Sequence, residues 1–575
     1  MLTKLGLRNF KRFDNVEIEL GKSVVFIGPN NSGKTTALQA LALWEIGLRR
    51  WNEKRMGKTS PEKRPGVTIN RRDLISLPIP DAHLLWRDLH VRNVSRKDGS
   101  QQTQSVCIDV LVEGVTAGTR WVCGLEFDFA NDESFYCRPL RTDQTGSTRM
   151  PIPDEAGSVR VAFLPPMSGL AAVEPKWEPG RINVLTGEGQ TAQVLRNLCH
   201  QICTDANPHA WDSLRSHIER LFGVQLLPPE HLVERGEITM SYRERDNTLD
   251  LSSSGRGLQQ TLLLLAHLYV NPKTVLLLDE PDAHLEILRQ RQIYGLLTEI
   301  AEQQGSQVIA ASHSEVILNE AADRDIVVAF VGKPHRIDDR GSQLLKSLKE
   351  LGFEQYYQAE QKGWVLYLEG STDLEILRSL AEKLDHDARK ELEAPFVCYI
   401  GGNQPQRARD HFYGLCEAKP DLLGIALFDR LDKELSTGAN LTELMWKRRE
   451  IENYICTREA LLAYARHDVY GDDLFERAEA EKRPLAMERS IEEMEQALRI
   501  QRKPDPWSAD CKVADEFLDP LFRNYFEALN LPMLFRKSDY HELARFIPSE
   551  QIDPEIMVKL DAIVDVACKA CPRRD

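Results

Sequence analysis

The chain has 575 residues, of which 42% are hydrophobic and 28% are charged, and its formal net charge is −15. This length exceeds one ordinary domain and predicts about two to four domains. No apolar run approaches the roughly 20 residues that cross a bilayer, and the N-terminus lacks the apolar core of a signal peptide, so we expect a cytoplasmic protein with no membrane partner. The negative net charge argues against general coating of nucleic acid but leaves room for local binding.

A phosphate-binding loop follows the first strands of the chain. The opening "LTKLGLRNFKRFDNVEIEL" alternates apolar and polar residues, and the strand "SVVF" leads into "FIGPNNSGKTT", which fits G-x-x-x-x-G-K-[ST] before an apolar helix. Backbone N–H groups and the helix N-terminus form a cradle for phosphates. We expect Lys34 to reach the β- and γ-phosphates of ATP and Thr35 to bind Mg²⁺. The candidate nucleotide-binding residues are Gly28, Asn30, Asn31, Ser32, Gly33, Lys34, Thr35 and Thr36.

A basic segment, Arg49 to Arg72, contains two prolines and two glycines and is predicted to be a loop between a helix and the next strand. One interpretation is a solvated surface loop. The other is a contact with DNA phosphates, which releases counterions. Farther on, residues 180–235 have a mixed helical pattern, and we expect a helical insertion that packs on the preceding domain.

Small residues then precede a long apolar helix in "LDLSSSGRGLQQTLLLLAHL", Leu249 to Leu268. Alone, this run would be a helix-capping loop. Its position between the phosphate loop and the next acidic strand argues against that interpretation, and Ser254, Gly255 and Gly257 are the candidate residues of this run.

The segment "KTVLLLDEPDAHLEIL" contains an apolar strand that ends in two acids. We expect Asp279 to hold Mg²⁺ and Glu280 to polarise the attacking water as a general base. The next strand, "QVIAASHS", places His313 near the γ-phosphate.

Taken together, the phosphate loop, the "SSSGRG" run and the acidic strand resemble ABC-type ATPases in the variant of RecF- and SMC-like proteins. The resemblance covers roughly residues 1–335. It implies an α/β, doubly wound ATPase core with an antiparallel lobe, and a nucleotide-driven homodimer in which the signature of one subunit closes over the ATP of another. We expect an ATPase domain at 1–343 with an insertion at about 180–235. No long heptad segment interrupts the domain, which excludes an SMC coiled coil.

A second α/β pattern begins after a linker helix expected at 344–362. Its strands "WVLYLEG", "APFVCYIGG" and "DLLGIALFDRLD" alternate with helices, and two of them end in acids. A polar loop is predicted between the last of these strands and the segment "MWKRREIENYI", Met445 to Ile455. Such acids meet at the carboxyl edge of a parallel sheet. Like charges in that position need a cation, and oxygen ligands suit Mg²⁺ or Mn²⁺. Two such ions can cleave a phosphodiester. The candidate acids are Glu369, Asp373, Asp429, Asp432, and the pair Glu450 and Glu452, which share a face if their segment is extended.

This arrangement resembles the Toprim domain, and an ABC-type ATPase followed by Toprim is the architecture of the OLD family of nucleases. The resemblance implies a Toprim-like α/β domain with a helical C-terminal region at 363–575, and a metal-dependent nuclease for double-stranded DNA that ATP regulates, with a role in defence against phage. Glu369 matches the first Toprim glutamate, Asp429 the first aspartate of D-x-D, and Glu450 and Glu452 the later acidic pair. Lys537 is the candidate basic residue for the transition state, with Lys512 as the alternative.

One departure from the Toprim pattern is the spacing in "FDRLDK", where Leu431 stands in place of the second aspartate and Asp432 follows it. This spacing favours an alternative function, in which an ATPase sensor carries a degenerate Toprim scaffold that holds a separate effector subunit. A third possibility is a RecF-like repair factor without nuclease activity. The acidic pair at Glu450 and Glu452 favours the nuclease.

The 11 cysteines are scattered, and their odd number argues against a disulfide framework. Cys568 and Cys571 have the spacing of metal ligands but no second pair nearby. His200 with Cys199 and Cys203 is a weaker candidate. For these side chains, packing against a helix is the favoured interpretation over a zinc site.

Overall fold

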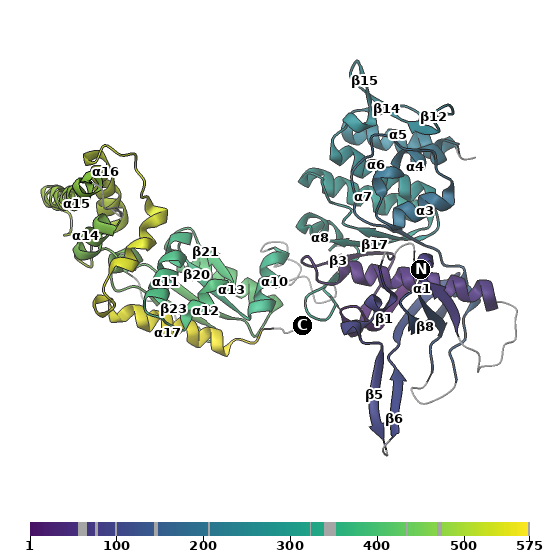
Figure 1. Cartoon of the computed structure of the whole chain (residues 1–575), viewed down its shortest axis with the longest axis horizontal. Helices are drawn as coiled ribbons and strands as arrows, with labels where there is room; N and C mark the ends of the chain where they lie inside the picture. Colours follow the sequence, from purple (N-terminus) through teal and green to yellow (C-terminus); the bar gives the residue numbers. More distant parts are fainter. Residues whose placement is uncertain are drawn as a thin grey trace. The chain divides into compact units, whose positions relative to one another are not determined.

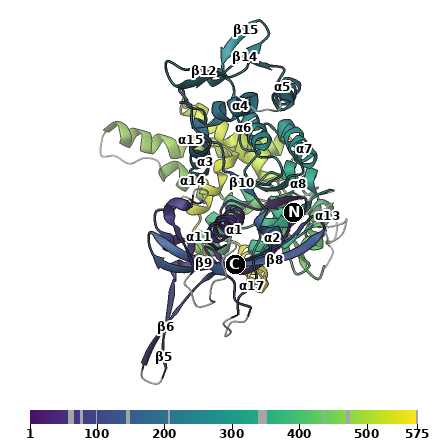
Figure 2. The ribbon, with the colours of Figure 1, turned by 90° about the vertical axis from the view of Figure 1, so that its right-hand side faces the viewer.

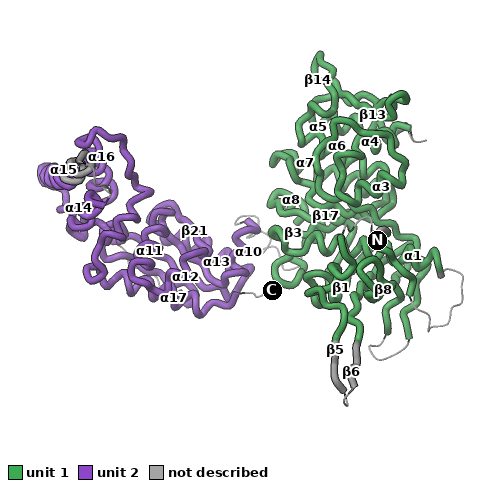
Figure 3. The backbone as a smooth tube through the Cα atoms, viewed as in Figure 1, with its two compact units in different colours: residues 1–349, 575 green, residues 350–574 purple. Residues whose placement is uncertain are grey.

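The structure is a computed structural model, and it divides into two compact units, Met1–Lys349 and Glu350–Arg574 (Figure 3). Each unit is described by itself. The described residues are 1–55, 66–74, 77, 79–97, 100–142, 148–204, 208–322, 324–337, 352–432, 435, 438–467 and 474–572.

The core of the first unit is a six-stranded sheet in which five strands are parallel (Figure 1). Its apolar strands are buried because helices and a second sheet cover both faces, as all-parallel sheets require. The long helix α1 (Lys34–Arg55) follows the inner strand β3 (Ser23–Ile27) after the loop at residues 28–33. In spatial order the strands are β10 (Val161–Leu164), β16 (Val275–Asp279), β17 (Gln307–Ser312), β3 (Ser23–Ile27), β18 (Ile326–Ala329) and the antiparallel β19 (His335–Arg336).

A second, antiparallel sheet packs on the other side of α1 and shares a core with it. The opening hairpin confirms the alternation of the first residues, since Leu5 pairs with Ile18 and both are buried. In spatial order its strands are β2 (Phe13–Glu19), β1 (Leu2–Phe10), β7 (Ile108–Thr116), β8 (Thr119–Asn131), β9 (Ser134–Pro139) and β4 (Val67–Asn70). A separate hairpin joins β5 (Arg92–Lys97) to β6 (Ser100–Ser105).

Helices and short strands form a lobe on the opposite face of the parallel sheet (Figures 1 and 2). The sequence predicts helices through residue 235, which is wrong beyond Phe222, because short strands with polar turns begin at Gln225. The helices are α3 (Pro179–Gly187), α4 (Leu195–Thr204), α5 (Pro208–Phe222), α6 (Arg256–Val270), α7 (Ile287–Gln304) and α8 (Glu315–Ala321). The strands are β11 (Gln225–Leu226), β12 (Glu230–Leu232), β13 (Glu237–Thr239), β14 (Ser241–Glu244) and β15 (Asn247–Asp250).

The second unit contains a four-stranded, fully parallel sheet (Figure 1). Its edge strand β23 lies in a region that the sequence predicts to be a polar loop. The strand forms because its Leu441 is buried against the sheet. In spatial order the strands are β21 (Val397–Tyr399), β20 (Trp364–Leu368), β22 (Leu423–Phe428) and β23 (Leu441–Met445). The associated helices are α10 (Phe353–Lys362), α11 (Ser371–Lys383), α12 (Ala388–Glu393) and α13 (Pro405–Ala418).

The rest of the second unit is mainly helical and shares one apolar core with the sheet. Its elements are η6 (Ile451–Tyr454), α14 (Arg458–His467), α15 (Leu474–Ile500), η7 (Ala514–Leu518), α16 (Asp519–Ala528), η8 (Lys537–Phe546) and α17 (Pro554–Lys569). The mixed α/β architecture of the two units confirms the predicted fold class. Among the described helices, none has the length and apolar character that crossing a bilayer requires.

Candidate nucleotide and acidic sites

The phosphate loop connects β3 to α1 at the carboxyl end of the parallel strands. At Gly28 an added Cβ would lie 2.9 Å from Ser32 Oγ, and at Gly33, where φ is +103°, it would lie 2.7 Å from the Phe13 ring. Both positions therefore need glycine. Lys34 is buried, and its Nζ donates to the carbonyl oxygens of Gly28 and Pro29 at 2.6 and 2.8 Å. The loop thus wraps around the lysine in the shape that phosphates require.

Thr35 and Asp279 meet across the sheet, since Thr35 Oγ1 donates to both carboxylate oxygens at 3.1 and 2.9 Å. Burial raises the pKa of Asp279 to about 6, while the hydrogen bond from Thr35 and the charge of Lys34 oppose the rise. Burial also lowers the pKa of Lys34, although nearby acids oppose this shift. A hydroxyl and a carboxylate in contact beside a lysine provide the pair of oxygen ligands that P-loop proteins give to Mg²⁺.

Glu280 and His313 lie at the ends of adjacent strands, with His313 Nδ1 3.8 Å from Glu280 Oε1. Glu280 has a positive φ of 48°, and its backbone N–H donates to Ala311 O at 2.8 Å. A non-glycine residue in this conformation is strained, and strain of this kind concentrates at functional sites. Both side chains are partly exposed and accessible to a nucleotide.

The structure adds two residues that the sequence analysis missed. Arg12, in the turn of the opening hairpin, donates from Nη1 to Asn31 O in the phosphate loop. Asp282 is buried beyond Glu280, and burial raises the pKa of its carboxyl group. The turn residue belongs to no recognised motif, so only the three-dimensional contact between the hairpin and the loop identifies it.

The small residues before α6 line a pocket of about 330 Å³ together with the segment that follows β16. Ser252 and Gly255 are exposed, whereas Leu251 and Leu258 on either side are buried. A Cβ at Gly257 would lie 3.5 Å from His284 O, an ordinary van der Waals contact, so the packing of the two segments does not require glycine at this position. The exposed edge can contact a ligand that another molecule holds.

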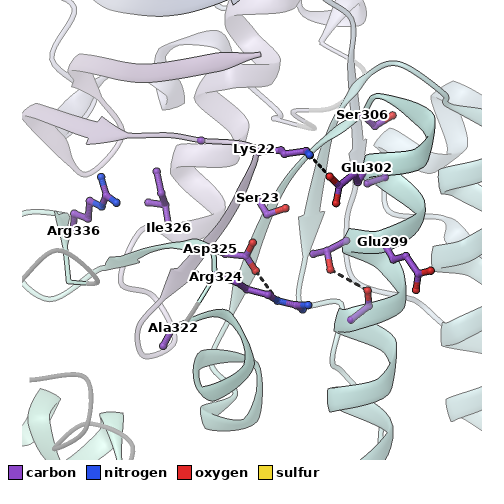
Figure 4. A pocket seen from close by; sticks show the side chains of 14 residues that line it. Lys22, Ser23, Glu299, Glu302, Ser306, Ala322, Arg324, Asp325, Ile326 and Arg336 are labelled. Carbon is purple, nitrogen blue, oxygen red and sulfur yellow. Dashed lines mark hydrogen bonds and ion pairs between the residues drawn. The ribbon is translucent and has the colours of Figure 1, made fainter. Parts of the chain in front are cut away.

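A larger cavity of about 870 Å³ lies where the strands of the parallel sheet begin, at the edge opposite the phosphate loop (Figure 4). Lys22 pairs with Glu302 at 2.5 Å, and Arg324 pairs with Asp325 at 3.3 Å. Because these charges pair with one another, we assign no ligand to this cavity.

In the second unit, acids from three segments lie at the carboxyl end of the sheet. Glu369 follows β20, Asp429 follows β22, and Glu450 and Glu452 belong to the turn of η6. The expectation of an extended segment at Glu450 and Glu452 is wrong. Glu450 caps a 3₁₀ turn in which its N–H donates to Asn453 Oδ1 at 3.0 Å, and Glu452 lies inside that turn.

The acids of this cluster act strongly on one another. Burial and the charges of Glu369 and Glu452 raise the pKa of Asp429 to about 8. Burial and the charge of Glu450 raise the pKa of Glu452 to about 8 as well. Glu450 accepts a hydrogen bond from Ala514 N at 2.6 Å, and burial raises its pKa. Crowded carboxylates with raised pKa values are typical of functional sites.

The other predicted acids have different surroundings. Asp373 accepts hydrogen bonds from the backbone N–H groups of Glu369 and Gly370 at 3.1 and 3.3 Å, and so caps α11. Its charge still contributes to the raised pKa of Asp429. Asp432 is exposed in the loop after β22. Asp373 therefore lies near the cluster, but its carboxylate already accepts these two backbone hydrogen bonds. Asp432 is exposed to solvent.

Both candidate lysines lie beside the acids. Lys512 and Lys537 contact Asp515 at 2.5 and 3.3 Å. Although burial opposes the shift, the charges of Glu452 and Asp515 raise the pKa of Lys537. Lys537 is thus the lysine whose charge acts on both Glu450 and Glu452. Asp515, which holds the two lysines, is a residue that sequence reasoning missed.

The basic segment Arg49–Arg72 is a loop only in part. α1 extends to Arg55, β4 begins at Val67, and residues 56–65 lie outside the described residues. Arg50 pairs with Asp73 at 2.5 Å, and Arg71 pairs with Glu133 at 3.2 Å. In the described part of this segment, these two arginines are neutralised by acids of the same unit.

In the described part of the chain, no group of three or more His, Cys, Asp or Glu residues is placed to hold a metal ion. Cys199 is buried in the core of the helical lobe, as the packing interpretation predicts. For Cys568 and Cys571 the packing interpretation is wrong, because both side chains are exposed.

Comparisons with known proteins relate the chain to ATPases. Residues 1–44 match the family model described as "AAA ATPase domain". Residues 205–319 match the model described as "AAA domain, putative AbiEii toxin, Type IV TA system". A curated relative, the OLD nuclease of Thermus scotoductus, is 24% identical over 352 residues. This match covers 58% of the chain and 64% of the relative, so it spans just under two thirds of that protein's length.

Solved structures with a similar backbone include the SMC head domain from Thermotoga maritima, at 14% identity and a TM-score of 0.32, covering 58% of this chain and 98% of that one. Another is an SMC head domain with an extended coiled coil bound to the C-terminal domain of ScpA derived from Pyrococcus furiosus, at 13% identity and a TM-score of 0.33, covering 58% and 96%. The two ATPase family models and the OLD nuclease confirm the resemblance of this chain to OLD-type ATPases.

Proposed function

We propose that the chain is an ATP-regulated, metal-dependent DNA endonuclease of the OLD type, which acts as a homodimer or higher homo-oligomer in defence against phage. The observation that carries the proposal is the shortage of positive charge around the acids of the second unit. Asp429 and Glu452 have pKa values raised to about 8 by burial and by neighbouring carboxylates. Both nearby lysines pair with Asp515. A cluster of this kind favours a cation.

The donors of the cluster fit Mg²⁺ or Mn²⁺, because they are carboxylate oxygens and include no thiol or imidazole. The residues that would hold the metal are Glu369, Asp429, Glu450 and Glu452, which are not placed as a ligand set in the structure and would have to close around the ion. A bound divalent metal supplies the Lewis-acid charge that activates water and stabilises the leaving oxygen in phosphodiester hydrolysis. Lys537 holds a positive charge beside Glu452, where it can stabilise the additional negative charge of a phosphate in the transition state.

Exposed basic residues next to the acids provide a surface for double-stranded DNA. Lys447 and Arg449 are exposed and immediately precede Glu450. The backbone N–H of Arg430 donates to Arg449 O at 3.2 Å, which holds the two arginines beside Asp429. Arg430 pairs with Asp510 at 2.6 Å, so the side chains of Lys447 and Arg449 are the ones proposed to neutralise backbone phosphates while the acids face the bond to be cleaved.

The first unit supplies the regulation by ATP. Lys34 holds the phosphates, and Thr35 with Asp279 provides the Mg²⁺ ligands. Glu280 orients the attacking water. His313 Nδ1 lies 3.8 Å from Glu280 Oε1, on the γ-phosphate side. In a homodimer, Ser254, Gly255 and Gly257 of one copy contact the ATP held by the other.

A second candidate function is an ATPase sensor whose acidic unit is a degenerate scaffold for a separate defence-system subunit. The observation that favours it is the position of Asp432, which is exposed and follows the first aspartate by three residues instead of two. The engagement of Asp373 in capping α11 points the same way.

Plasmid nicking separates the two functions. Purified protein is incubated with supercoiled DNA and Mg²⁺ or Mn²⁺, with and without ATP, and EDTA serves as the control. The nuclease predicts metal-dependent conversion to open-circular or linear DNA, and a change in its rate with ATP. Intact DNA with either metal under every nucleotide condition would contradict the nuclease and leave the scaffold.

A further inference from the structure

The exposed small residues before α6 are held from behind by hydrogen bonds. Asp250 caps this turn by accepting from Ser252 N at 2.8 Å. Ser254 Oγ donates to Leu251 O at 2.7 Å, and Gln259 Nε2 donates to Ser254 O at 3.0 Å. The shape of the turn therefore depends on side chains that do not belong to its exposed edge.

Asp250 connects this turn to a buried arginine. Arg196 comes from the first turn of α4, and its side chain is 2% exposed. Its Nη2 lies 3.4 Å from Asp250 Oδ1, and its Nη1 donates to Ala171 O at 2.8 Å. Although burial opposes the shift, hydrogen bonds from Ser252 and the charge of Arg196 lower the pKa of Asp250. Asp250 is thus an anion at neutral pH that joins the guanidinium to the turn.

A buried acid, Glu174, holds Arg196 in place. Glu174 is fully buried and accepts from the backbone N–H groups of Arg196 and Asn197 at 3.0 and 2.6 Å, so it caps α4. Its Oε2 is also 3.7 Å from Arg196 Nη1. The amide of Asn197 donates to the same carboxylate at 2.7 Å. The guanidinium therefore has one inner, immobile acid and one outer acid, Asp250, that is 46% exposed.

We propose that Arg196 and Asp250 are positioning residues that hold the turn Leu251–Gly255 in the conformation that recognises ATP bound to a second copy of the chain. This inference rests on the proposed function, because it assumes closure of a homodimer around ATP. The physical reason concerns conformational entropy. A flexible run of serines and glycine loses conformational freedom when it binds a phosphate, and a buried ionic anchor reduces that loss in advance.

On this proposal, Asp250 of one copy affects hydrolysis of the ATP that the other copy holds. In Asp250→Asn the side chain can still cap the turn, but it loses its ionic link to Arg196. We expect ATP affinity to remain within about twofold of wild type, because the phosphate loop is untouched, and the rate of hydrolysis to fall about 10- to 100-fold, as misplaced catalytic contacts do. The matched control is Asp246→Asn, an exposed aspartate in the β14–β15 turn of the same lobe. It should hydrolyse ATP at the wild-type rate.

A mixing experiment distinguishes positioning from a general loss of stability. Lys34→Ala lacks a working phosphate loop but keeps the turn, whereas Asp250→Asn has the opposite defect. Random exchange of subunits gives heterodimers with one complete composite site, so an equal mixture should recover about a quarter of the wild-type rate. The mixture of Lys34→Ala with Asp250→Asn must exceed the summed rates of the two variants alone. No recovery, with a normal rate for the Asp246→Asn control, overturns the positioning role.

The conservative variant Arg196→Lys keeps the charge but loses the forked geometry of the guanidinium. The proposal expects an intermediate rate of hydrolysis and the same recovery on mixing with Lys34→Ala. If the chain does not act as a homodimer closed around ATP, a different pattern results. The specific ATPase activity of wild-type protein then does not change with protein concentration. A concentration-dependent wild-type activity together with a wild-type rate for Asp250→Asn overturns only the inference.

Discussion

The two candidate sites follow the same plan and differ in charge balance. Each places an acid directly after a buried parallel strand, Asp279 in the first unit and Asp429 in the second. Asp279 contacts a hydroxyl at 2.9 Å and lies beside the buried charge of Lys34, and its pKa rises only to about 6. Asp429 has further carboxylates as its neighbours, and its pKa rises to about 8.

This difference indicates what each site lacks. The first site has its own lysine for the phosphates and requires only ATP with its ion. The second site has more negative charge than its lysines can neutralise, because Asp515 already engages both of them. A folded protein tolerates such a cluster only where a cation or a proton compensates it. The comparison therefore supports the proposal that the first unit binds nucleotide and that the second unit carries out a metal-dependent reaction.

The largest effect is expected from the acids of the second unit. Glu369→Ala and Asp429→Ala each remove a proposed metal ligand, so plasmid nicking should fall by about 1,000-fold or more, while ATP hydrolysis stays within about twofold of wild type. Parallel assays of nicking and of phosphate release measure both activities. Loss of ATP hydrolysis in these variants, in a protein that remains folded, would contradict the separation of the two sites.

The first unit provides the reciprocal variant. Lys34→Ala removes the cation from the phosphate loop, and we expect ATP affinity and hydrolysis to fall by about 100-fold or more. Equilibrium binding of a fluorescent ATP analogue measures the first effect. Nucleotide-independent nicking should persist in this variant. Wild-type ATP affinity would show that Lys34 does not hold the phosphates.

Glu280→Gln tests the general base without disturbing the phosphate loop. The amide cannot accept the proton of the attacking water, so hydrolysis should slow by about 100-fold while ATP binding persists. The variant should also accumulate an ATP-bound dimer, which light scattering coupled to gel filtration can measure. Unchanged turnover would remove Glu280 from this role.

A smaller effect concerns stability and pH. The raised pKa of Asp429 means that the folded protein binds more protons than the unfolded chain between the ordinary aspartate pKa and about pH 8. Stability without metal should therefore be greatest below this window and decline as the pH rises through it. Asp429→Asn removes this ionisation. Between pH 5 and pH 8 in EDTA, its unfolding midpoint should decrease less than that of wild type, by about 2–4 °C for each kcal/mol of repulsion removed.

Added Mg²⁺ should reduce the difference between wild type and Asp429→Asn in the pH dependence of the unfolding midpoint, because the cation stabilises the ionised carboxylates of wild type. Differential scanning calorimetry in EDTA and in Mg²⁺ provides the measurement. Identical pH dependence of wild type and Asp429→Asn in EDTA would show that Asp429 is not crowded by other charges.

The smallest effect is expected at Asp432. Because this side chain is exposed in the loop after β22, Asp432→Ala should reduce nicking by only about two- to fivefold. Initial rates on supercoiled plasmid measure the change. A loss as large as that of Asp429→Ala would instead place Asp432 among the metal ligands, with the loop rearranged around the ion.

The phosphate loop could be predicted from the sequence because its geometry is local. A strand, two required glycines, a lysine and a helix follow one another within a few residues, and the structure places them together. The same holds for the strand that ends in Asp279. Contacts between distant segments carry no such signal. The hydrogen bond from Arg12 to the phosphate loop and the pairing of Asp515 with Lys512 and Lys537 appear only in three dimensions.

Two local predictions in the second half failed for physical reasons. The strand β23 carries the polar residues Thr442 and Glu443, which suggest a loop, but Glu443 is paired bidentately with Arg409 at 2.5 and 2.7 Å. The segment at Glu450 and Glu452 turns because Glu450 and Asn453 form a capping box. In both cases a side-chain partner overrides the pattern that the sequence suggests.

Metal binding by the second unit tests the central claim most directly. Protein with Thr35→Ala and Asp279→Ala, which lacks both proposed oxygen ligands of the ATP site, is titrated with Mn²⁺ without nucleotide in a calorimeter or followed by electron paramagnetic resonance, so that the ATP site contributes no metal. We predict saturable binding that Glu369→Ala and Asp429→Ala each weaken by at least about 10-fold, the loss expected for one charged ligand. Mn²⁺ binding that is absent, or that is unchanged by both substitutions, would contradict the assignment of the acidic cluster as a metal-dependent nuclease site.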